Sequence, residues 1–158
     1  MADWLMKSEP GSYGIADLER DGTTGWEGVR NFQARNAMRA MRVGDRVLFY
    51  HSNAKPSGVA GTAVVSREAY PDPTQFDSDS SYRDPTSDLA DPRWSAVQIG
   101  FVERFPEVVG LAALKADPAL AGLEVARKGS RLSVLPVNAA HFDHIVAGGR
   151  GHGQVRRP

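Results

Sequence analysis

The sequence contains no cysteine, and this absence removes two kinds of site at once. No disulfide framework can stabilise the fold, and no thiolate can hold a zinc ion. Such a chain is compatible with a reducing compartment, where disulfides rarely persist. Its 158 residues are enough to bury a sizeable core within one domain.

Long apolar runs are also missing. No stretch approaches the roughly 20 residues that a membrane-spanning helix needs. The first ten residues, MADWLMKSEP, lack the basic segment followed by an apolar segment that is typical of a secretory signal. We therefore expect a soluble cytoplasmic protein with no membrane partner, or a nuclear protein if the source is eukaryotic.

An excess charge of either sign is absent as well, because the formal net charge is zero. The charge is nevertheless uneven: residues 71–93 carry a balance of −4, so the remainder carries +4. We call residues 71–93 the acidic loop, and its aspartates are Asp72, Asp77, Asp79, Asp84, Asp88 and Asp91. A local positive field elsewhere favours an anionic partner even when the total charge is zero.

The motifs of common enzymes and metal sites are absent or incomplete. There is no Walker motif and no G-x-S-x-G turn, and GGRGHG does not fit a dinucleotide fingerprint. His141 and His144 lack a third ligand at suitable spacing. Residues 77–84 lack the central glycine and the terminal glutamate of a calcium loop. We expect no catalytic residue, no metal and no cofactor, and therefore no enzyme.

Strand-like and helix-like patterns are mixed along the chain, which predicts an α+β fold. The expected strands cover residues 3–8, 45–52, 58–70, 93–105 and 131–137. The expected helices cover residues 31–42, 111–117 and 138–147, with no more than a helical turn at 14–20. Asn138 is the expected N-cap of the last helix. In the helix at 31–42, Phe32, Met38 and Met41 are expected to share an apolar face.

A tryptophan between two glycines begins the segment GWEGVRNFQARN, residues 25–36. Trp26 is followed by three arginines, Arg30, Arg35 and Arg39, and by amide side chains. Structural packing is the usual role of a single tryptophan, and a solvated surface is the usual place of an arginine. The alternative is a pocket in which the indole stacks on a planar ring while polar groups hydrogen-bond to its edge.

Seven segments occur in an order that resembles the EVE domain family: WLMKSEP, WEGVRNFQARN, FYHSN, EAYPD, YRDP, PRWSAV and GSRLSVLPV. The resemblance implies an EVE domain over residues 1–147, and we expect residues 148–158 to form a disordered Gly/Arg-rich tail. It implies a PUA-like fold, a small bent β-barrel with flanking helices. That fold is related to the YTH domain, which recognises N6-methyladenine in RNA with an aromatic cage.

The resemblance also implies a function: a non-catalytic module that binds a modified nucleobase in DNA or RNA. The candidate bases are 5-methylcytosine, its oxidised derivatives and N6-methyladenine. Trp26 would form one wall of the pocket and, as a wall, should contribute little to the core. The other expected ligand-binding residues are Asn31, Ser52, Asn53, Lys7, Ser8, Tyr70 and Pro71. The expected phosphate contacts are Arg30, Arg35 and Arg131. Phe32 stands where many relatives have tyrosine and is expected in the core.

Three other functions stay open at this point. The chain could be a small-molecule or nucleotide-binding module, a protein-interaction module, or an enzyme acting on nucleobases. An enzyme would need a carboxylate in the pocket, and Glu9 is the nearest candidate. We expect a monomer whose partner is nucleic acid carrying a modified base, with a nuclease or an RNA-processing factor as a possible downstream partner.

Overall fold

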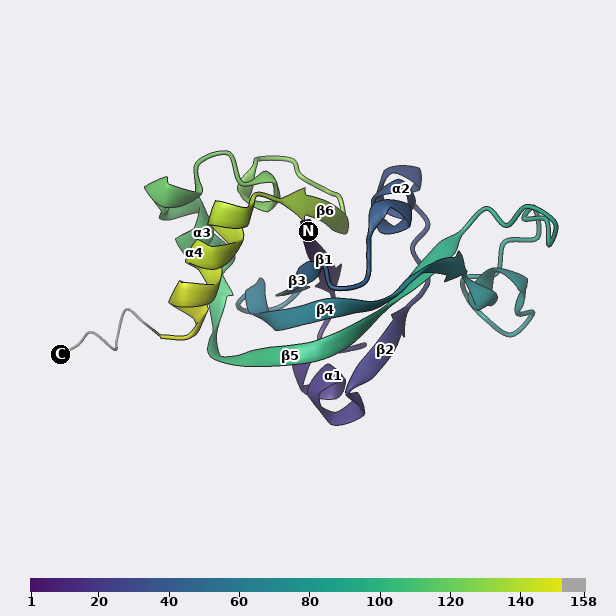
Figure 1. Ribbon diagram of the computed structural model, residues 1–158, viewed down its shortest axis with the longest axis horizontal. Coiled ribbons are helices and arrows are strands. Elements are labelled where there is room, and N and C mark those ends of the chain that lie inside the picture. Colours follow the sequence, from purple (N-terminus) through teal and green to yellow (C-terminus); the bar gives the residue numbers. More distant parts are fainter. Residues whose placement is uncertain (152–158) are drawn as a thin grey trace.

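The computed structural model describes residues 1–151 and shows one curved sheet surrounded by short helices (Figure 1). The strands are β1 (Asp3–Ser8), β2 (Thr23–Trp26), β3 (Arg46–His51), β4 (Gly58–Pro71), β5 (Ser95–Gly110) and β6 (Val134–Val137). The helices are α1 (Ile15–Asp21), α2 (Phe32–Ala40), α3 (Leu111–Ala116) and α4 (Ala139–Gly149). Short 3-10 turns, η1 (Pro73–Phe76), η2 (Pro118–Leu120) and η3 (Glu124–Ala126), complete the described chain. The α+β class is therefore confirmed.

The six strands form one mixed sheet in the order β2-β5-β4-β3-β1-β6. Only the β1–β3 pair is parallel, and the other neighbours are antiparallel. Irregularities in register along the β4–β5 pair increase the local twist of these two long strands. No pairing within residues 1–151 joins β2 to β6, so hydrogen bonds do not close the barrel that the sequence suggested.

The sheet separates two apolar cores, which explains the almost continuous apolar runs of β1 and β3. Met6 and Phe49 face one core together with α1 and α2, whereas Leu5 and Leu48 face the other. The second core also contains side chains of α3 and α4. A strand buried on both faces shows an unbroken apolar run, whereas a half-buried strand shows strict alternation.

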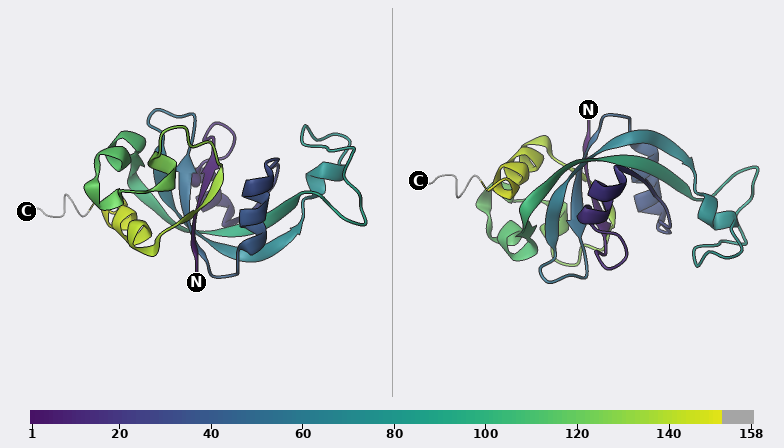
Figure 2. Two further views of the ribbon diagram at one scale, coloured as in Figure 1. Left: turned by 90° about the horizontal axis from the view of Figure 1, so that it is seen from above. Right: turned by 90° about the horizontal axis from the view of Figure 1, so that it is seen from below.

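The acidic loop links β4 to β5 and lies at the opposite end of the molecule from α3 and α4 (Figures 1 and 2). Between these ends lie β1, β2 and α2 (Figure 1). Helix α4 begins at the expected N-cap, because the Asn138 side chain accepts a hydrogen bond from the Ala140 amide at 2.8 Å. No helix within residues 1–151 is long and apolar enough to cross a membrane.

Phe32 is not in the core, and that prediction is wrong. Its side chain is 54% exposed and stacks on Trp94 with ring centres 4.9 Å apart. The reason is helical geometry: six residues from Phe32 to Met38 fall about 120° short of two full turns, so the two side chains point in different directions. The buried residues of α2 are Ala34 and Met38.

The chain end differs in part from expectation. Helix α4 continues to Gly149, two residues beyond the expected domain boundary. Arg150 then forms an ion pair with Glu103 of β5 at 2.9 Å. The rest of the expected disordered tail, residues 152–158, lies outside the described residues.

Candidate functional site

A cavity of about 530 Å³ lies beside Trp26, at the C-terminal ends of β1 and β2. We call it the Trp26 cavity. Its lining is formed by residues 7–9, 12–13 and 24–30, Tyr82 and Ser133. The acidic loop contributes Tyr82, and the approach to β6 contributes Ser133, so four separate stretches of the chain meet here.

Trp26 belongs to both the core and the cavity. It ends β2, where it pairs with Val97 of β5, and its side chain is only 8% exposed. Its ring meets Phe49 edge-on, with centres 5.5 Å apart and planes at 88°. The expectation that a pocket wall contributes little to the core is therefore wrong for Trp26. The part of the indole that reaches the cavity is held rigidly by the core behind it.

The glycines that flank Trp26 allow two tyrosines to approach closely. Gly28 has φ +83°, and a Cβ there would come within 2.8 Å of the Tyr82 ring. A Cβ on Gly25 would come within 2.8 Å of the Tyr70 hydroxyl and 3.0 Å of a Glu27 carboxylate oxygen. A side chain at Gly28 would be strained and would displace the Tyr82 ring, and a side chain at Gly25 would displace the ends of the Tyr70 and Glu27 side chains.

Two charged side chains of the cavity have no hydrogen bond or ion pair within residues 1–151. One is Lys7, whose Nζ lies 5.6 Å from the centre of the Tyr50 ring. Partial burial lowers the pKa of Lys7 from its ordinary value. The other is Glu27, whose pKa is raised first by burial and then by the nearby charge of Asp72. A cavity that holds one unpaired donor and one unpaired acceptor is suited to a ligand with polar edges.

Other polar groups of the cavity already have partners. The Ser8 hydroxyl donates to the Tyr13 carbonyl at 2.6 Å, which fixes the turn after β1. The Tyr13 hydroxyl donates to Asp21 at 2.9 Å. Glu9 accepts a hydrogen bond from Asn53 Nδ2 at 3.0 Å. These contacts shape the rim of the cavity and leave fewer groups for a ligand.

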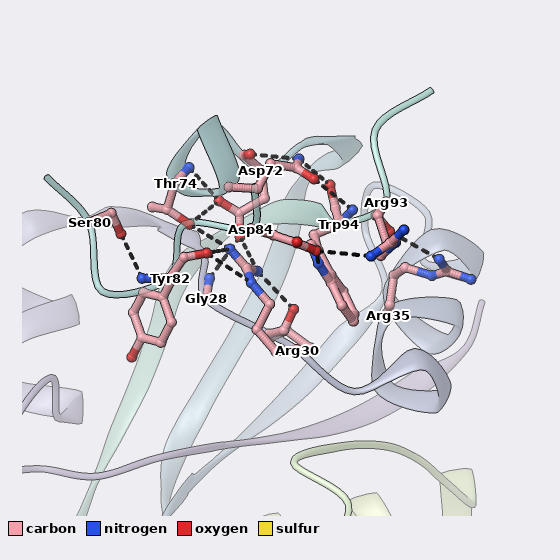
Figure 3. Close-up of polar contacts among 12 residues, drawn as sticks. Gly28, Arg30, Arg35, Asp72, Thr74, Ser80, Tyr82, Asp84, Arg93 and Trp94 are labelled. Atoms are coloured by element: carbon pink, nitrogen blue, oxygen red, sulfur yellow. Dashed lines mark hydrogen bonds and ion pairs between the residues drawn. The ribbon is translucent and has the colours of Figure 1, made fainter. Parts of the chain in front are cut away.

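Arg30 holds the acidic loop against the segment that follows Trp26 (Figure 3). Its Nη1 lies 3.1 Å from Asp72 Oδ2, and its Nη2 donates to Thr74 Oγ1 at 3.0 Å and to the Tyr82 carbonyl at 2.6 Å. Asp72 is fully buried and also accepts from the Gly28 amide at 2.8 Å. We call Arg30, Asp72, Thr74 and the Tyr82 carbonyl the Arg30 clamp. It positions Tyr82 at the cavity.

The arginines of α2 have similar structural contacts. Arg35 donates to the Arg93 carbonyl at 3.0 Å and lies over the Phe32 ring, 4.8 Å from its centre. Arg39 donates to Ser95 Oγ at 2.9 Å. These bonds tie α2 to the start of β5. Within residues 1–151, Arg131 is exposed and has no such partner.

A metal site is not formed by the described residues, since no three histidine, aspartate or glutamate side chains converge within residues 1–151. His144 instead lies 2.6 Å from Asp117 on the far side of the sheet from α1 and α2. His141 and His144 therefore do not form part of a metal-binding cluster in this region.

Comparison with known proteins assigns the family. A family model described as the EVE domain matches residues 2–148. The chain belongs to the EVE domain family. Human thymocyte nuclear protein 1 is 41% identical over 162 residues, which covers 91% of this chain and 72% of the human protein.

Solved structures agree with this assignment of the EVE domain. A Pseudomonas syringae protein superposes with a TM-score of 0.90 at 48% identity, covering 94% of this chain and 99% of that chain. The structure of human THYN1 protein in complex with 5-methylcytosine containing DNA has a TM-score of 0.88 at 36% identity, covering all of both chains. A YTH domain of Zygosaccharomyces rouxii shares the fold, with a TM-score of 0.55 at 15% identity over 94% of this chain and 86% of that chain.

In this EVE domain, the expected site residues fall into two groups. Lys7, Ser8, Trp26 and Arg30 line the Trp26 cavity. The others do not line it: Asn31, Arg35, Ser52, Asn53, Tyr70, Pro71 and Arg131.

Most of the residues outside the lining have structural contacts. Asn31 is the N-cap of α2 and accepts from the Ala34 amide at 2.9 Å. The Ser52 amide donates to the Ser8 carbonyl at 2.9 Å, and Asn53 holds Glu9 as described above. Pro71 pairs with Ser95 at the end of β4. The Tyr70 hydroxyl would lie 2.8 Å from a Cβ on Gly25, the residue before Trp26.

Among the lining residues that sequence reasoning did not assign to the site are Tyr13, Glu27 and Tyr82. Glu27 was visible in the motif itself, as the one carboxylate in G-W-E-G. Tyr82 lies in the YRDP segment, but nothing near it in the sequence indicates its contact with Gly28, 54 positions away. Only the folded acidic loop brings it to the cavity.

Proposed function

We propose that this EVE domain is a non-catalytic module that binds a modified base of DNA, with 5-methylcytosine and its oxidised derivatives as the candidate ligands. The observation that carries the proposal is the Trp26 cavity, in which a rigid indole lies beside an unpaired donor and an unpaired acceptor. Similarity over the whole chain to a human protein solved with 5-methylcytosine containing DNA supports it. N6-methyladenine and RNA are the secondary candidates.

The Trp26 indole would contribute to the affinity for a base more than to the selection of one base over another. Stacking of a base on an aromatic side chain contributes about 1–3 kcal/mol and tolerates any base. Burial of one methyl group adds about 0.8 kcal/mol, which is about a fourfold change in affinity. The methylated base should also fit the Trp26 cavity better. We therefore expect a preference of about tenfold for the methylated base over plain cytosine.

Binding is favoured over catalysis by the state of the carboxylates. Glu9, the group that an enzyme would use to activate water, is exposed and held by Asn53. The remaining lining carboxylate, Glu27, has no histidine or lysine bonded to it within residues 1–151. A general base and its orienting partner are usually within hydrogen-bond reach of one another.

The test is a binding titration with two matched tryptophan variants. Trp26→Leu removes the aromatic wall, whereas Trp4→Leu removes a tryptophan of equal exposure from the same core without touching the cavity. Short DNA oligonucleotides with one 5-methylcytosine or one cytosine are titrated against wild type and both variants. Thermal unfolding of each variant is measured in parallel, because both substitutions destabilise the core.

We expect Trp26→Leu to weaken binding of the methylated oligonucleotide by roughly 5- to 150-fold, the equivalent of about 1–3 kcal/mol of stacking. We expect Trp4→Leu to lower the unfolding temperature but to keep the affinity of its folded fraction. Equal losses of affinity in both variants would contradict a stacking role for Trp26.

A further inference from the structure

A module that recognises 5-methylcytosine in DNA must distinguish it from thymine, since thymine carries the same methyl group at the same ring position. The two bases differ at position 4, where cytosine has an amine donor and thymine has a carbonyl acceptor. They also differ at N3, which is an acceptor in cytosine and an N–H donor in thymine. An indole wall and a methyl contact treat both bases alike, because neither distinguishes a donor from an acceptor. Discrimination therefore needs a polar group on the base edge that carries position 4 and N3.

Glu27 is the group in the Trp26 cavity that fits this requirement. It directly follows Trp26 in the chain and lines the same cavity. Its carboxylate has no hydrogen-bond partner within residues 1–151, and it approaches the same point above Gly25 as the Tyr70 hydroxyl. An ionised carboxylate can only accept hydrogen bonds, so it pairs with an amine and is repelled by a carbonyl oxygen.

We propose that Glu27 determines base identity in this site by accepting a hydrogen bond from the exocyclic amine of cytosine. The inference rests on the proposed function, and it narrows the ligand to amine-bearing bases. Thymine would present its O4 to the Glu27 carboxylate, leaving two acceptors face to face with no proton between them. Glutamate or aspartate accepting from the cytosine amine is a pairing that proteins also use in the major groove of DNA.

Neighbouring polar groups are less suited to this task. Glu9 already accepts from Asn53, and Asp72 is fully occupied by the Arg30 clamp and the Gly28 amide. Lys7 is the complementary group, because its ammonium can only donate and so pairs with a carbonyl oxygen. Cytosine offers such an oxygen at position 2, on the same polar edge as the amine.

The test compares three oligonucleotides that differ at one position: 5-methylcytosine, cytosine and thymine. Wild type is expected to prefer 5-methylcytosine over thymine by at least roughly tenfold, the scale of one good base-edge contact. Glu27→Gln is nearly isosteric, and its amide can rotate to donate to a carbonyl. We expect this variant to reduce the preference over thymine at least fivefold while keeping the preference over cytosine, which depends on the methyl group.

The ratio of affinities is the readout, because loss of a negative charge alone strengthens binding to every oligonucleotide equally. Glu107→Gln removes the same charge from β5 outside the cavity and serves as the control. Glu27→Asp retains the carboxylate and should retain a preference for 5-methylcytosine over thymine. Unfolding temperatures establish that each variant is folded.

The possible failures can be told apart. If wild type binds none of the oligonucleotides, the proposed function itself is wrong. If wild type prefers 5-methylcytosine over thymine and folded Glu27→Gln keeps that preference unchanged, the role of Glu27 is wrong and the function stands. Loss of the preference in Glu9→Gln instead would also overturn the assignment to Glu27.

Discussion

The Arg30 clamp and the Trp26 cavity are neighbours that share one arginine, yet they use their polar groups in opposite ways. In the clamp, Arg30 and the buried Asp72 satisfy one another and recruit Thr74. In the cavity, Lys7 and Glu27 face open space without partners in the described chain. Paired charges of this kind hold a structure together, whereas unpaired charges around a rigid aromatic ring are available to a ligand.

The contrast between paired and unpaired charges also applies to Arg30 and Arg35. Arg30 and Arg35 looked like phosphate ligands in the sequence because they follow Trp26 so closely. In the structure their donors are engaged with Asp72, Asn36 and backbone carbonyls. A phosphate would have to displace these bonds. Positive charge near a site therefore predicts anion binding less well than positive charge that lacks an internal partner.

The largest effect is expected from breaking the clamp. Arg30→Ala leaves the carboxylate of Asp72 buried without its cation, which should lower the free energy of unfolding by about 3 kcal/mol. Lys7→Ala removes a cation that has no partner in residues 1–151, and should change that free energy by less than about 0.5 kcal/mol. Urea denaturation measures the free energy of unfolding of both variants. Similar losses of stability in the two variants would contradict the claim that the Arg30 clamp holds the structure together while Lys7 of the Trp26 cavity does not.

An intermediate effect is expected from Asp84, which bonds the acidic loop to Trp94, the residue just before β5. Hydrogen bonds from the Thr86 hydroxyl and then from Trp94 Nε1, 2.8 Å away, lower the pKa of Asp84 to about 2. A carboxylate with a depressed pKa stabilises the folded state above its ordinary pKa, and this contribution is lost as the pH falls through the folded value. The relevant window therefore runs from about pH 4 down to about pH 2.

Asp84→Asn tests this assignment. The variant lacks the titrating group, so its stability should fall less steeply than that of wild type between about pH 4 and pH 2. Denaturant unfolding at a series of pH values measures the two slopes. Parallel curves for wild type and Asp84→Asn would show that Asp84 is not linked to folding in this range.

The smallest effect is expected from single phosphate contacts. If Arg131 contacts a phosphate of a single strand, Arg131→Ala should reduce the slope of log affinity against log salt by about 0.7. Arg35→Ala is the matched arginine variant, and it should leave the slope unchanged because Arg35 is engaged with Arg93 and Asn36. A reduced slope in Arg35→Ala alone would mean that its internal bonds yield to the nucleic acid.

Much of the fold followed from local patterns. The apolar runs of β1 and β3 and the Asn138 cap of α4 are set by residues close in sequence, and each was confirmed. Strand β2 was missed because Thr23–Trp26 has no apolar alternation, and it exists only because β5 is long enough to pair with it. Phe32 was misplaced because it was grouped with Met38 and Met41, which are buried, although it lies about 120° from Met38 around the helix.

The candidate site was less accessible to sequence reasoning than the fold. Trp26 and Lys7 were chosen from motifs, whereas the YRDP segment that contains Tyr82 does not indicate the long-range contact of Tyr82 with Gly28. Asn31 was taken for a ligand contact, and in the structure its side chain caps α2. Polar residues next to a tryptophan that lines a cavity can bond to the backbone or stay free for a ligand, and their hydrogen bonds distinguish these roles.

The central claim is that the modified base lies against Trp26, and a crystal structure with a bound oligonucleotide tests it most directly. The oligonucleotide would be a short DNA strand containing one 5-methylcytosine. We predict that the methylated base occupies the Trp26 cavity with its ring parallel to the indole and its amine toward Glu27. A base bound elsewhere, for example in the hollow of about 580 Å³ between β5, α3 and α4, would contradict the account.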